Sequence, residues 1–468
     1  MVREKAFYRT MFKIALPSAF QGLVSLLVVY LDDIMVSKIT DPVITDIGQR
    51  ALTGVGQTNA ITNFFTAAVL GVTSGASVLI SQYWGKRDEK HIRQVLPIAP
   101  TLSLLAAFVF IALALIMPTK LLTLVISTSG GDTSTVSLAV TYLTTVCFSY
   151  LPYAVSQSVV GMLRAVEVVK VTLYITVASL LTNLFFNWVL IFGHLGFPAL
   201  GVRGAAVATV IARVIEMVIT LFYLFRVQKA IKVRPRDLIK APHEMWRDYR
   251  KYGLPVGIGD MQWSLVGLGK AAIIGHLTTA TGMIATDIIS ANRIAESMMS
   301  LGMIFTNSLT AGACVIIAKS VGEKDYEKTR RYAGTIQIMF ACIGVVMCTV
   351  VFLSRGFFVS TYGGLTDAAR ENARNMIALG ALTLLGTTYH ASCFVGINRG
   401  AGDGKFVMIV DMICGWLVVL PLSYLAAYVW KLGPALIFLF IRIDQCFKWL
   451  IAFIRLRGNR WIKNVTKD

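Results

Sequence analysis

Long apolar runs, each of about twenty residues or more, follow one another along almost the whole chain and are separated by polar or basic connections. A helix needs about 20 apolar residues to cross the roughly 30 Å hydrocarbon core of a bilayer. Backbone groups in lipid must be satisfied within the segment, so helices rather than open strands are expected. The pattern predicts an all-α membrane protein with twelve transmembrane helices, at 14–37, 47–80, 95–117, 136–164, 168–193, 199–226, 253–278, 284–318, 330–354, 369–398, 402–428 and 432–457.

The predicted spans fall into two similar halves. KIALPSAFQGLVSLL from Lys13 resembles KYGLPVGIGDMQWSL from Lys251; further along, YWGKRDEKHIRQ matches SVGEKDYEKTRR, and VVGMLRAVEVVK matches FVGINRGAGDGK. Each half has an even number of spans, so the repeats are parallel and related by an axis along the membrane normal. We expect a six-helix lobe at 1–230, a basic cytoplasmic linker at 231–250 and a second six-helix lobe at 251–468.

Composition and charge support a membrane protein with a defined orientation. Of the 468 residues, 56% are hydrophobic and only 15% are charged, against about a quarter charged in soluble domains. The net charge of +19 arises mainly in the N-terminal segment, the WGKRDEKHIR loop, the 226–251 stretch and the C-terminal tail. The positive-inside rule places these segments, and both termini, in the cytoplasm. We expect a multi-pass protein of the cytoplasmic (inner) membrane that contacts membrane lipids and binds no nucleic acid.

Signatures of cofactor, metal or enzyme chemistry are missing from the sequence. The seven cysteines lie singly in apolar segments, with no C-x-x-C pair, so neither a disulfide nor a metal site is predicted. There is no P-loop, and GAGDG at 400–404 connects two spans, which is typical of a turn. The first apolar run is too long for a signal-peptide core and lacks an A-x-A site, so we expect it to stay in the mature protein. The chain is not expected to be an enzyme or to hold a cofactor.

Two adjacent acids near the end of the first span, Asp32 and Asp33, are the first candidates for function. Burying an ionisable side chain in a span costs at least about 2.5–3.5 kcal/mol, so such residues are usually functional. Asp32 follows Pro17 by fifteen positions, which at 1.5 Å per residue places it in the outer half of the membrane. Low dielectric and a like-charged neighbour both disfavour ionisation, so a proton could be taken up near neutral pH. Alternatively, both acids lie at the interface where the helix ends.

The fifth and sixth spans carry polar residues of the same kind. Asn183 and Asn187 are one turn apart and therefore share a helix face. Their amides could coordinate an ion or simply bridge helices by hydrogen bonds. Thr209 is a lesser candidate for the same cluster. Together with the two acids of the first span, these residues make up the predicted cation-coupling set.

In the second half, Lys270 occupies the repeat position of Asp32 when the two Leu-Pro pairs are aligned. Lys270 could pair with Asp32 or Asp33 in one conformation and separate in another, or it could extend its ammonium to the outer surface. The candidates for the substrate cavity are Asp32, Lys270, Arg293, Glu296 and His390.

For other charged or titratable residues of the second half, structural roles such as ion pairing or packing are expected. Arg293 and Glu296 are i, i+3 neighbours, and we expect them to pair with each other. His390 could titrate near neutral pH, although packing with a hydrogen bond is the commoner role of a single membrane histidine. We expect Asp411 to pair with Arg442 or Lys448.

Several longer stretches together resemble the multidrug and toxic compound extrusion (MATE) family of the flippase superfamily, and within it the DinF-like prokaryotic branch. They are ALP from Ala15, DDIMVS, ALTGVGQTN, GASVLISQYWGKRD, TNLFFNWVLIFGHLGFPALGVRGAAVAT and NRGAGD, in this order over nearly the full length. The resemblance implies two six-helix lobes forming a V-shaped cavity that opens alternately to either face. It also implies export of bulky organic cations and drugs in exchange for H+ or Na+.

The same resemblance implies roles for single residues. Asp32 aligns with the aspartate that couples the cation, whereas Asp33 stands where the family often has Thr. Asn187 stands where related antiporters often have Asp, which removes a carboxylate and favours H+ over Na+. We expect a monomeric secondary active antiporter acting on small-molecule organic cations or drugs. A flippase for lipid-linked precursors is the alternative within the superfamily, and a non-transporting scaffold or receptor is a third class.

Overall fold

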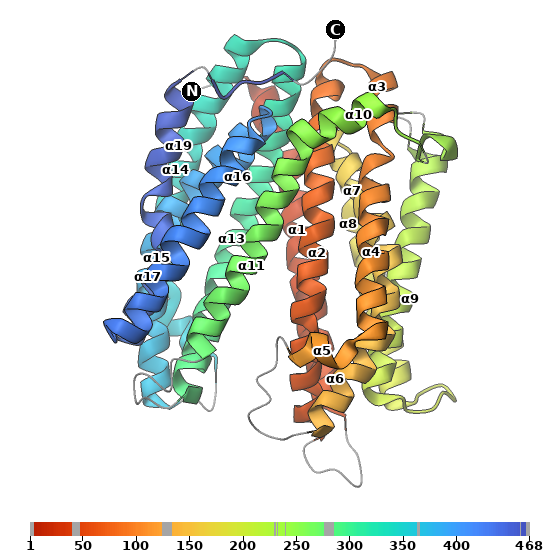
Figure 1. Ribbon diagram of the computed structural model, residues 1–468, viewed down its shortest axis with the longest axis vertical. Helices are drawn as coiled ribbons and strands as arrows, with labels where there is room; N and C mark the ends of the chain where they lie inside the picture. The colour runs from red at the N-terminus through yellow and green to blue at the C-terminus, as the bar shows by residue number, and fades with distance from the viewer. Residues whose placement is uncertain are drawn as a thin grey trace. The chain divides into compact units, whose positions relative to one another are not determined.

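The computed structural model of the protein describes residues 4–39, 47–123, 133–228, 231, 233–238, 240–275, 285–362, 366–458 and 460–464. Within these ranges the chain is helical, and they contain no strand, which confirms the all-α prediction (Figure 1). The α-helices of the first half are α1 Lys5–Ser37, α2 Ile47–Gly85, α3 Glu89–Val95, α4 Ile98–Ile116, α5 Pro118–Thr123, α6 Thr133–Val146, α7 Tyr150–Ala165, α8 Lys170–Phe192 and α9 Gly201–Phe222. Those that follow are α10 His243–Asp248, α11 Leu254–Gly275, α13 Ala285–Gly322, α14 Tyr326–Ser360, α15 Asp367–Ala391, α16 Gly404–Met412, α17 Leu420–Tyr424, α18 Pro434–Phe440 and α19 Lys448–Arg457.

Short 3₁₀ and π-helical turns connect or interrupt these helices. The 3₁₀ turns are η1 Cys147–Ser149, η3 Pro235–Leu238 and η8 Ile443–Cys446, and the π-helical turns are η2 Tyr223–Val227, η4 Tyr249–Gly253, η5 Ser392–Asn398, η6 Ile413–Val419 and η7 Leu425–Val429. Several therefore lie inside predicted spans, where a wider or tighter turn shifts the helical register.

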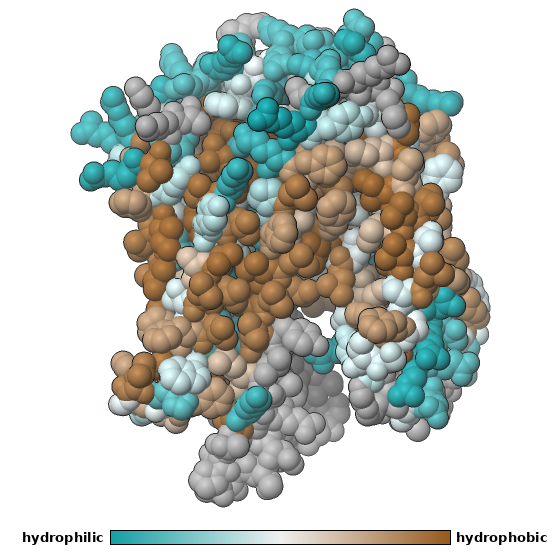
Figure 2. Space-filling view, turned by 180° about the vertical axis from the view of Figure 1, so that it is seen from behind, coloured by the Kyte–Doolittle hydropathy of each residue, from teal (hydrophilic) through white to brown (hydrophobic). Residues whose placement is uncertain are grey.

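Ten segments of the described residues are long and apolar enough to cross a membrane, and each overlaps one of the twelve predicted spans. The two remaining predictions correspond to α11 and to the α18–α19 region. The last span is thus not one continuous helix, because η8 separates α18 from α19. Large apolar side chains such as Phe108, Leu353 and Phe357 are exposed. Hydrophobic residues cover the middle of the face seen in Figure 2, and hydrophilic residues gather toward its upper edge, as expected for helices surrounded by lipid.

The chain forms two compact units. Unit 1 consists of 1–19, 81–88 and 250–468, and unit 2 consists of 20–80 and 89–249. In unit 1, α13, α14 and α15 pack together, and α11 packs against α16. In unit 2, α9 packs against α6, α7 and α8, and Phe65 stacks on Tyr150 in the core with ring centroids 4.4 Å apart.

Matching turns at equivalent positions support the internal repeat. Arg87 follows α2 and Lys324 follows α13, and both have left-handed backbones, with φ of 60° in each case. Glu167 and Gly402 are a second such pair, with φ of 63° and 86°. Non-glycine residues seldom adopt positive φ, so the shared conformation reflects a duplicated turn rather than chance. These two turns therefore match in backbone geometry as well as in sequence.

The ends of α2 and α13 cross closely within unit 1. A Cβ on Gly85 would overlap the carbonyl oxygen of Lys319, and a Cβ on Gly322 would overlap the carbonyl oxygen of Gln82. Each glycine lies three residues after the carbonyl that the other one meets, so the contact is reciprocal. Only glycine permits so close an approach of two backbones.

Candidate functional site

A chain of polar side chains links three helices of unit 2 at the position predicted for cation coupling. Asn187 Nδ2 donates to Asp32 Oδ1 at 2.5 Å and to Asn183 Oδ1 at 3.2 Å. Asn183 Nδ2 donates in turn to Thr209 Oγ1 at 3.4 Å. The structure therefore brings together four of the five predicted residues, from α1, α8 and α9. The side chain of Asp33 lies outside the described residues.

The helix geometry explains why these side chains meet. Asn183 and Asn187 are i, i+4 neighbours on α8 and are 4% and 1% exposed. Gly204 brings α9 against α8, since a Cβ there would overlap the carbonyl oxygen of Leu190. The close packing of α8 and α9 places Thr209 within reach of Asn183. Buried amides at a helix–helix contact are satisfied by such cross-helix bonds.

The site contains a buried polar atom that has no hydrogen-bond partner among the described residues. This atom is Asn187 Oδ1. A buried acceptor without a donor costs free energy of about 1–3 kcal/mol. Asn187 Oδ1 is an acceptor beside a carboxyl group, so it is suited to accept a hydrogen bond or to contact a cation. Asn187 could therefore interact with Asp32 in either protonation state.

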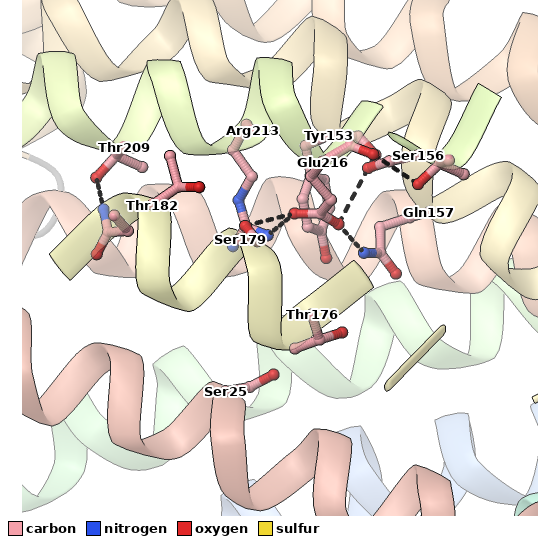
Figure 3. A network of polar contacts seen from close by, with 12 residues as sticks. Ser25, Tyr153, Ser156, Gln157, Thr176, Ser179, Thr182, Thr209, Arg213 and Glu216 are labelled. Carbon is pink, nitrogen blue, oxygen red and sulfur yellow. Dashed lines mark hydrogen bonds and ion pairs between the residues drawn. The ribbon is translucent and has the colours of Figure 1, made fainter. Parts of the chain in front are cut away.

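A second polar cluster in unit 2 surrounds Glu216 on α9 (Figure 3). Arg213 Nη1 donates to Glu216 Oε2 at 2.6 Å, and Ser179 Oγ donates to the same oxygen at 3.1 Å. Gln157 Nε2 and Ser156 Oγ donate to Glu216 Oε1 at 3.1 Å and 3.3 Å. The side chain of Glu216 is only 3% exposed. Four donors from α7, α8 and α9 hold it, which is how buried carboxylates are normally compensated.

Arg213 connects this cluster to its surroundings. Its guanidinium lies 5.0 Å from the centroid of the Tyr153 ring on α7. Glu216 is not among the residues predicted from the sequence. The available signal was an acid three residues after an arginine inside the sixth predicted span, the same spacing that was noted for Arg293 and Glu296.

Unit 1 contains a third buried cluster, centred on Lys448. Its ammonium lies 2.9 Å from Asp411 Oδ1 and 2.8 Å from Asp444 Oδ2. The side chains of Lys448 and Asp444 are 1% and 0% exposed. The expected pairing of Asp411 with Arg442 or Lys448 is confirmed for Lys448. The 3₁₀ turn η8 presents Asp444 one turn before Lys448, so that both charges face the same point.

Two of the remaining cavity candidates of the second half, Lys270 and His390, have contacts other than ion pairs. The Lys270 ammonium lies 4.6 Å from the centroid of the Trp263 ring. His390 Nδ1 is 2.9 Å from the carbonyl oxygen of Gly386 on its own helix, a packing arrangement.

The expected pairing of Arg293 with Glu296 is wrong. Glu296 is paired with Arg442 Nη2 at 2.7 Å, and Arg293 is exposed, with no ion pair between the two recorded in the described residues. The guanidinium of Arg442 also lies 5.0 Å from the ring of Phe438, which belongs to α18. A long-range partner from the last span has therefore replaced the local one.

The combination of an all-helical, multi-pass fold, a duplicated architecture and charged clusters inside the spans defines the class as a membrane transporter rather than an enzyme. The sequence model of the MatE family matches residues 17–189 and 276–425, more than half of the chain. The protein belongs to the MatE family. The match covers both halves of the repeat, and the predicted family is thereby confirmed.

Curated relatives cover most of the chain. The uncharacterized transporter YisQ of Bacillus subtilis is 23% identical over 92% of this chain and 90% of its own length. The probable multidrug resistance protein NorM of Bacillus cereus is 23% identical over 80% of each chain.

Solved structures share the fold. A transporter of the MOP superfamily from Pyrococcus furiosus, described as having a binding pocket of reverse polarity, superposes with a TM-score of 0.82 at 19% identity, covering 98% of this chain and 96% of its own. An outward-facing multidrug resistance MATE transporter also gives 0.82, at 18% identity and with the same coverage. These similarities confirm the fold and leave the placement in the DinF-like branch a prediction.

Proposed function

We propose that this protein is a secondary active exporter that moves organic cations and drugs out of the cell in exchange for protons. Membership of the MatE family and the similarity to relatives named as multidrug resistance proteins support the substrate class. The coupling ion is inferred from the contacts of Asp32, which are the observation on which the proposal depends.

Asn187 is suited to both protonation states of Asp32. Its amide N–H donates to the carboxylate when Asp32 is ionised. Its Oδ1, buried and without a partner in the described chain, is available as the acceptor when Asp32 carries a proton. Uptake of one proton changes the charge of the carboxyl group from −1 to 0. A proton and a monovalent organic cation are therefore equivalent in charge at this site.

The surroundings favour H+ over Na+. Sodium sites in transporters draw on unwound backbone carbonyls and helix ends. Asn183 and Asn187 lie in the interior of the continuous helix α8, Lys170–Phe192, where carbonyl oxygens are engaged in the helix. Asp32, the two amides and Thr209 therefore offer side-chain oxygens only, with a single carboxylate among them.

The transport cycle follows from this exchange. A proton that reaches Asp32 from outside neutralises the site and favours release of the cationic substrate outward. Loss of that proton to the cytoplasm restores the negative charge, and a new cation is taken up from the cytoplasm or the inner leaflet. Alternating access requires only that the two states of the carboxyl group favour different arrangements of the protein.

Proteoliposomes that contain a cationic dye, ethidium, test the proposal. We expect dye movement under a pH gradient alone and none under a Na+ gradient alone. Glu371→Gln, which removes an exposed acid, should transport like the wild type. Movement under Na+ alone would contradict proton coupling. No movement under either gradient would favour the alternative, a flippase for lipid-linked precursors.

A further inference from the structure

Without Lys270, the buried cluster around Lys448 in unit 1 has more negative than positive charges. Lys448 is shared by two carboxylates, Asp411 at 2.9 Å and Asp444 at 2.8 Å. This group of three has a net charge of −1 when all are ionised. The neighbouring pair of Glu296 and Arg442 is neutral by itself. One further positive charge is needed for the cluster to be neutral inside the membrane, where an uncompensated charge is costly.

Lys270 supplies that charge from the face of an aromatic ring. The Lys448 ammonium lies 4.4 Å from the centroid of the Trp263 ring, and the Lys270 ammonium lies 4.6 Å from the same centroid. No hydrogen bond or ion pair of the Lys270 ammonium is recorded in the described part of the chain. Trp is the best of the aromatic rings for holding a cation. Lys270 is therefore held by the ring and by the net charge of the cluster, both of which would attract another cation equally well.

Polar atoms without partners lie beside the same ring. Gln262 is only 6% exposed, yet neither its Oε1 nor its Nε2 has a partner among the described residues. A Cβ added to Gly415 would be 2.8 Å from Val266 Cγ2, 3.5 Å from Trp263 Cζ3 and 3.6 Å from Gln262 Oε1. The amide and the ring therefore both lie beside Gly415, next to Val266. Buried polar atoms of this kind usually have a ligand or an ordered water as partner.

We propose that Trp263 and Gln262 form a subsite for the charged head of an organic cation, and that Lys270 is a tethered cation that occupies this subsite between transport events. The proposal rests on the proposed function for its substrate class. A substrate cation replaces the Lys270 ammonium on the ring, and the net charge of the cluster is unchanged. Return of the ammonium to the ring then displaces the substrate.

The Trp263 ring determines which kinds of cation the subsite favours. A quaternary or aryl cation is weakly hydrated and gains from contact with the ring, whereas a small metal cation would lose water without finding enough oxygen ligands. The Gln262 amide adds one donor and one acceptor, which suits substrates that carry polar groups beside their charge. The subsite is therefore expected to accept varied cations rather than one molecule.

Binding of tetraphenylphosphonium to the purified protein in detergent, measured by isothermal titration calorimetry, tests the subsite. Lys270→Met removes the competing charge and keeps an apolar side chain of similar length, so we expect about tenfold tighter binding. Lys270→Arg retains a competing cation and should bind as the wild type does. Lys405→Met, which removes an exposed lysine of the same unit, is the matched control and should change nothing.

A second pair of variants tests the ring. Trp263→Leu should weaken binding by about tenfold and Trp263→Phe by less, because Phe keeps an aromatic face. In proteoliposomes, Lys270→Met should slow dye export although it binds dye more tightly, because the Lys270 ammonium no longer displaces the substrate.

The outcomes separate the two proposals. If the wild type binds the probe and Lys270→Met binds it no more tightly, the tethered-cation inference is overturned while the proposed function stands. If neither protein binds the probe, the proposed substrate class fails and the subsite fails with it. Faster dye export in Lys270→Met would also contradict the displacement step.

Discussion

At the scale of single residues, the neutral amide of Asn187 leaves Asp32 without a second carboxylate as its neighbour at this position. Asn187→Asp places a second carboxylate next to the first, and two like charges so close disfavour simultaneous ionisation. One proton should then be retained to higher pH. We expect the pH at which dye export is half-maximal to rise by about one unit or more, measured with pH gradients of fixed size at a series of internal pH values.

The control for this change is Asn375→Asp, which adds an acid at an exposed position of α15. Its pH profile should match that of the wild type. An unshifted profile in a well-folded Asn187→Asp protein would mean that the Asp32 proton is not the coupled one.

Glu216 is predicted to stabilise the fold of unit 2. Glu216→Ala leaves Arg213 without its partner and removes the acceptor of three more side chains. Removing one member of a buried pair costs about 3–5 kcal/mol, and the partly exposed Arg213 places this case at the lower end. We expect a marked fall in the thermal unfolding temperature in detergent, much larger than that of Glu371→Gln.

Replacing both members of this pair separates charge from packing. Arg213→Met combined with Glu216→Met removes both charges, and such replacements are often nearly neutral for stability. The double variant should therefore be more stable than Glu216→Ala. Equal stability of Glu216→Ala and the wild type would show that the cluster has no structural role.

Sequence spacing found some of these residues and missed others for a physical reason. Asn183 and Asn187 were predictable because i, i+4 spacing fixes a shared face of one helix. Arg213 with Glu216 and Arg293 with Glu296 have the same i, i+3 spacing, yet among the described residues only the first two form an ion pair. In the second, Arg442 of the last span reaches Glu296 instead. Long-range partners of this kind depend on tertiary packing, which no local pattern contains.

At the scale of helices, the α8–α9 contact positions the candidate coupling site. Gly204→Ala should push α9 away from Leu190 and lengthen the Asn183–Thr209 hydrogen bond, because the new methyl group meets backbone. We expect reduced stability and impaired proton-coupled transport. Gly56→Ala on α2 meets nothing within 4 Å and should be neutral or slightly stabilising, as in an ordinary helix. Wild-type transport by Gly204→Ala would show that this packing is not needed.

The spans of unit 1 are less regular than hydrophobic runs can indicate. The runs predicted continuous helices at 402–428 and 432–457, whereas the first contains the π-helical turns η6 and η7 and the second is divided by η8. Hydropathy reports that a segment is apolar but not how its backbone turns. Two of these turns adjoin the proposed cation subsite, because Gly415 of η6 lies beside Gln262 and Trp263, and Asp444 of η8 pairs with Lys448.

At the scale of the whole molecule, the sequence predicts two similar halves, and the two halves differ at equivalent positions that carry charge. Two left-handed turns occur at equivalent positions of both halves. The equivalent positions Asp32 and Lys270 nevertheless carry opposite charges, with an amide beside the first and an indole ring beside the second. The halves have therefore taken different roles, proton exchange in one and cation binding in the other according to our two proposals. Whether Lys270 pairs with Asp32 or Asp33 in another conformation stays a prediction.

Orientation in the membrane gives a further prediction. Near the N-terminus Glu4 accepts a hydrogen bond from Tyr332, and near the C-terminus Asn464 donates one to Tyr326, so both ends of the described chain lie at the start of α14. The distribution of Lys and Arg indicates that this end faces the cytoplasm. Epitope tags at the two termini should both be reached by antibody only after the cells are permeabilised. Labelling of either tag on intact cells would contradict this topology.

The central claim is that Asp32 gives up a proton when a cationic substrate binds. The most direct test is to add tetraphenylphosphonium to the purified protein in weakly buffered detergent solution and to record the protons released. We predict release from the wild type at a pH where Asp32 is protonated, and none from Asp32→Asn, whose folding is checked by thermal unfolding. Equal proton release from the wild type and from Asp32→Asn would contradict the account.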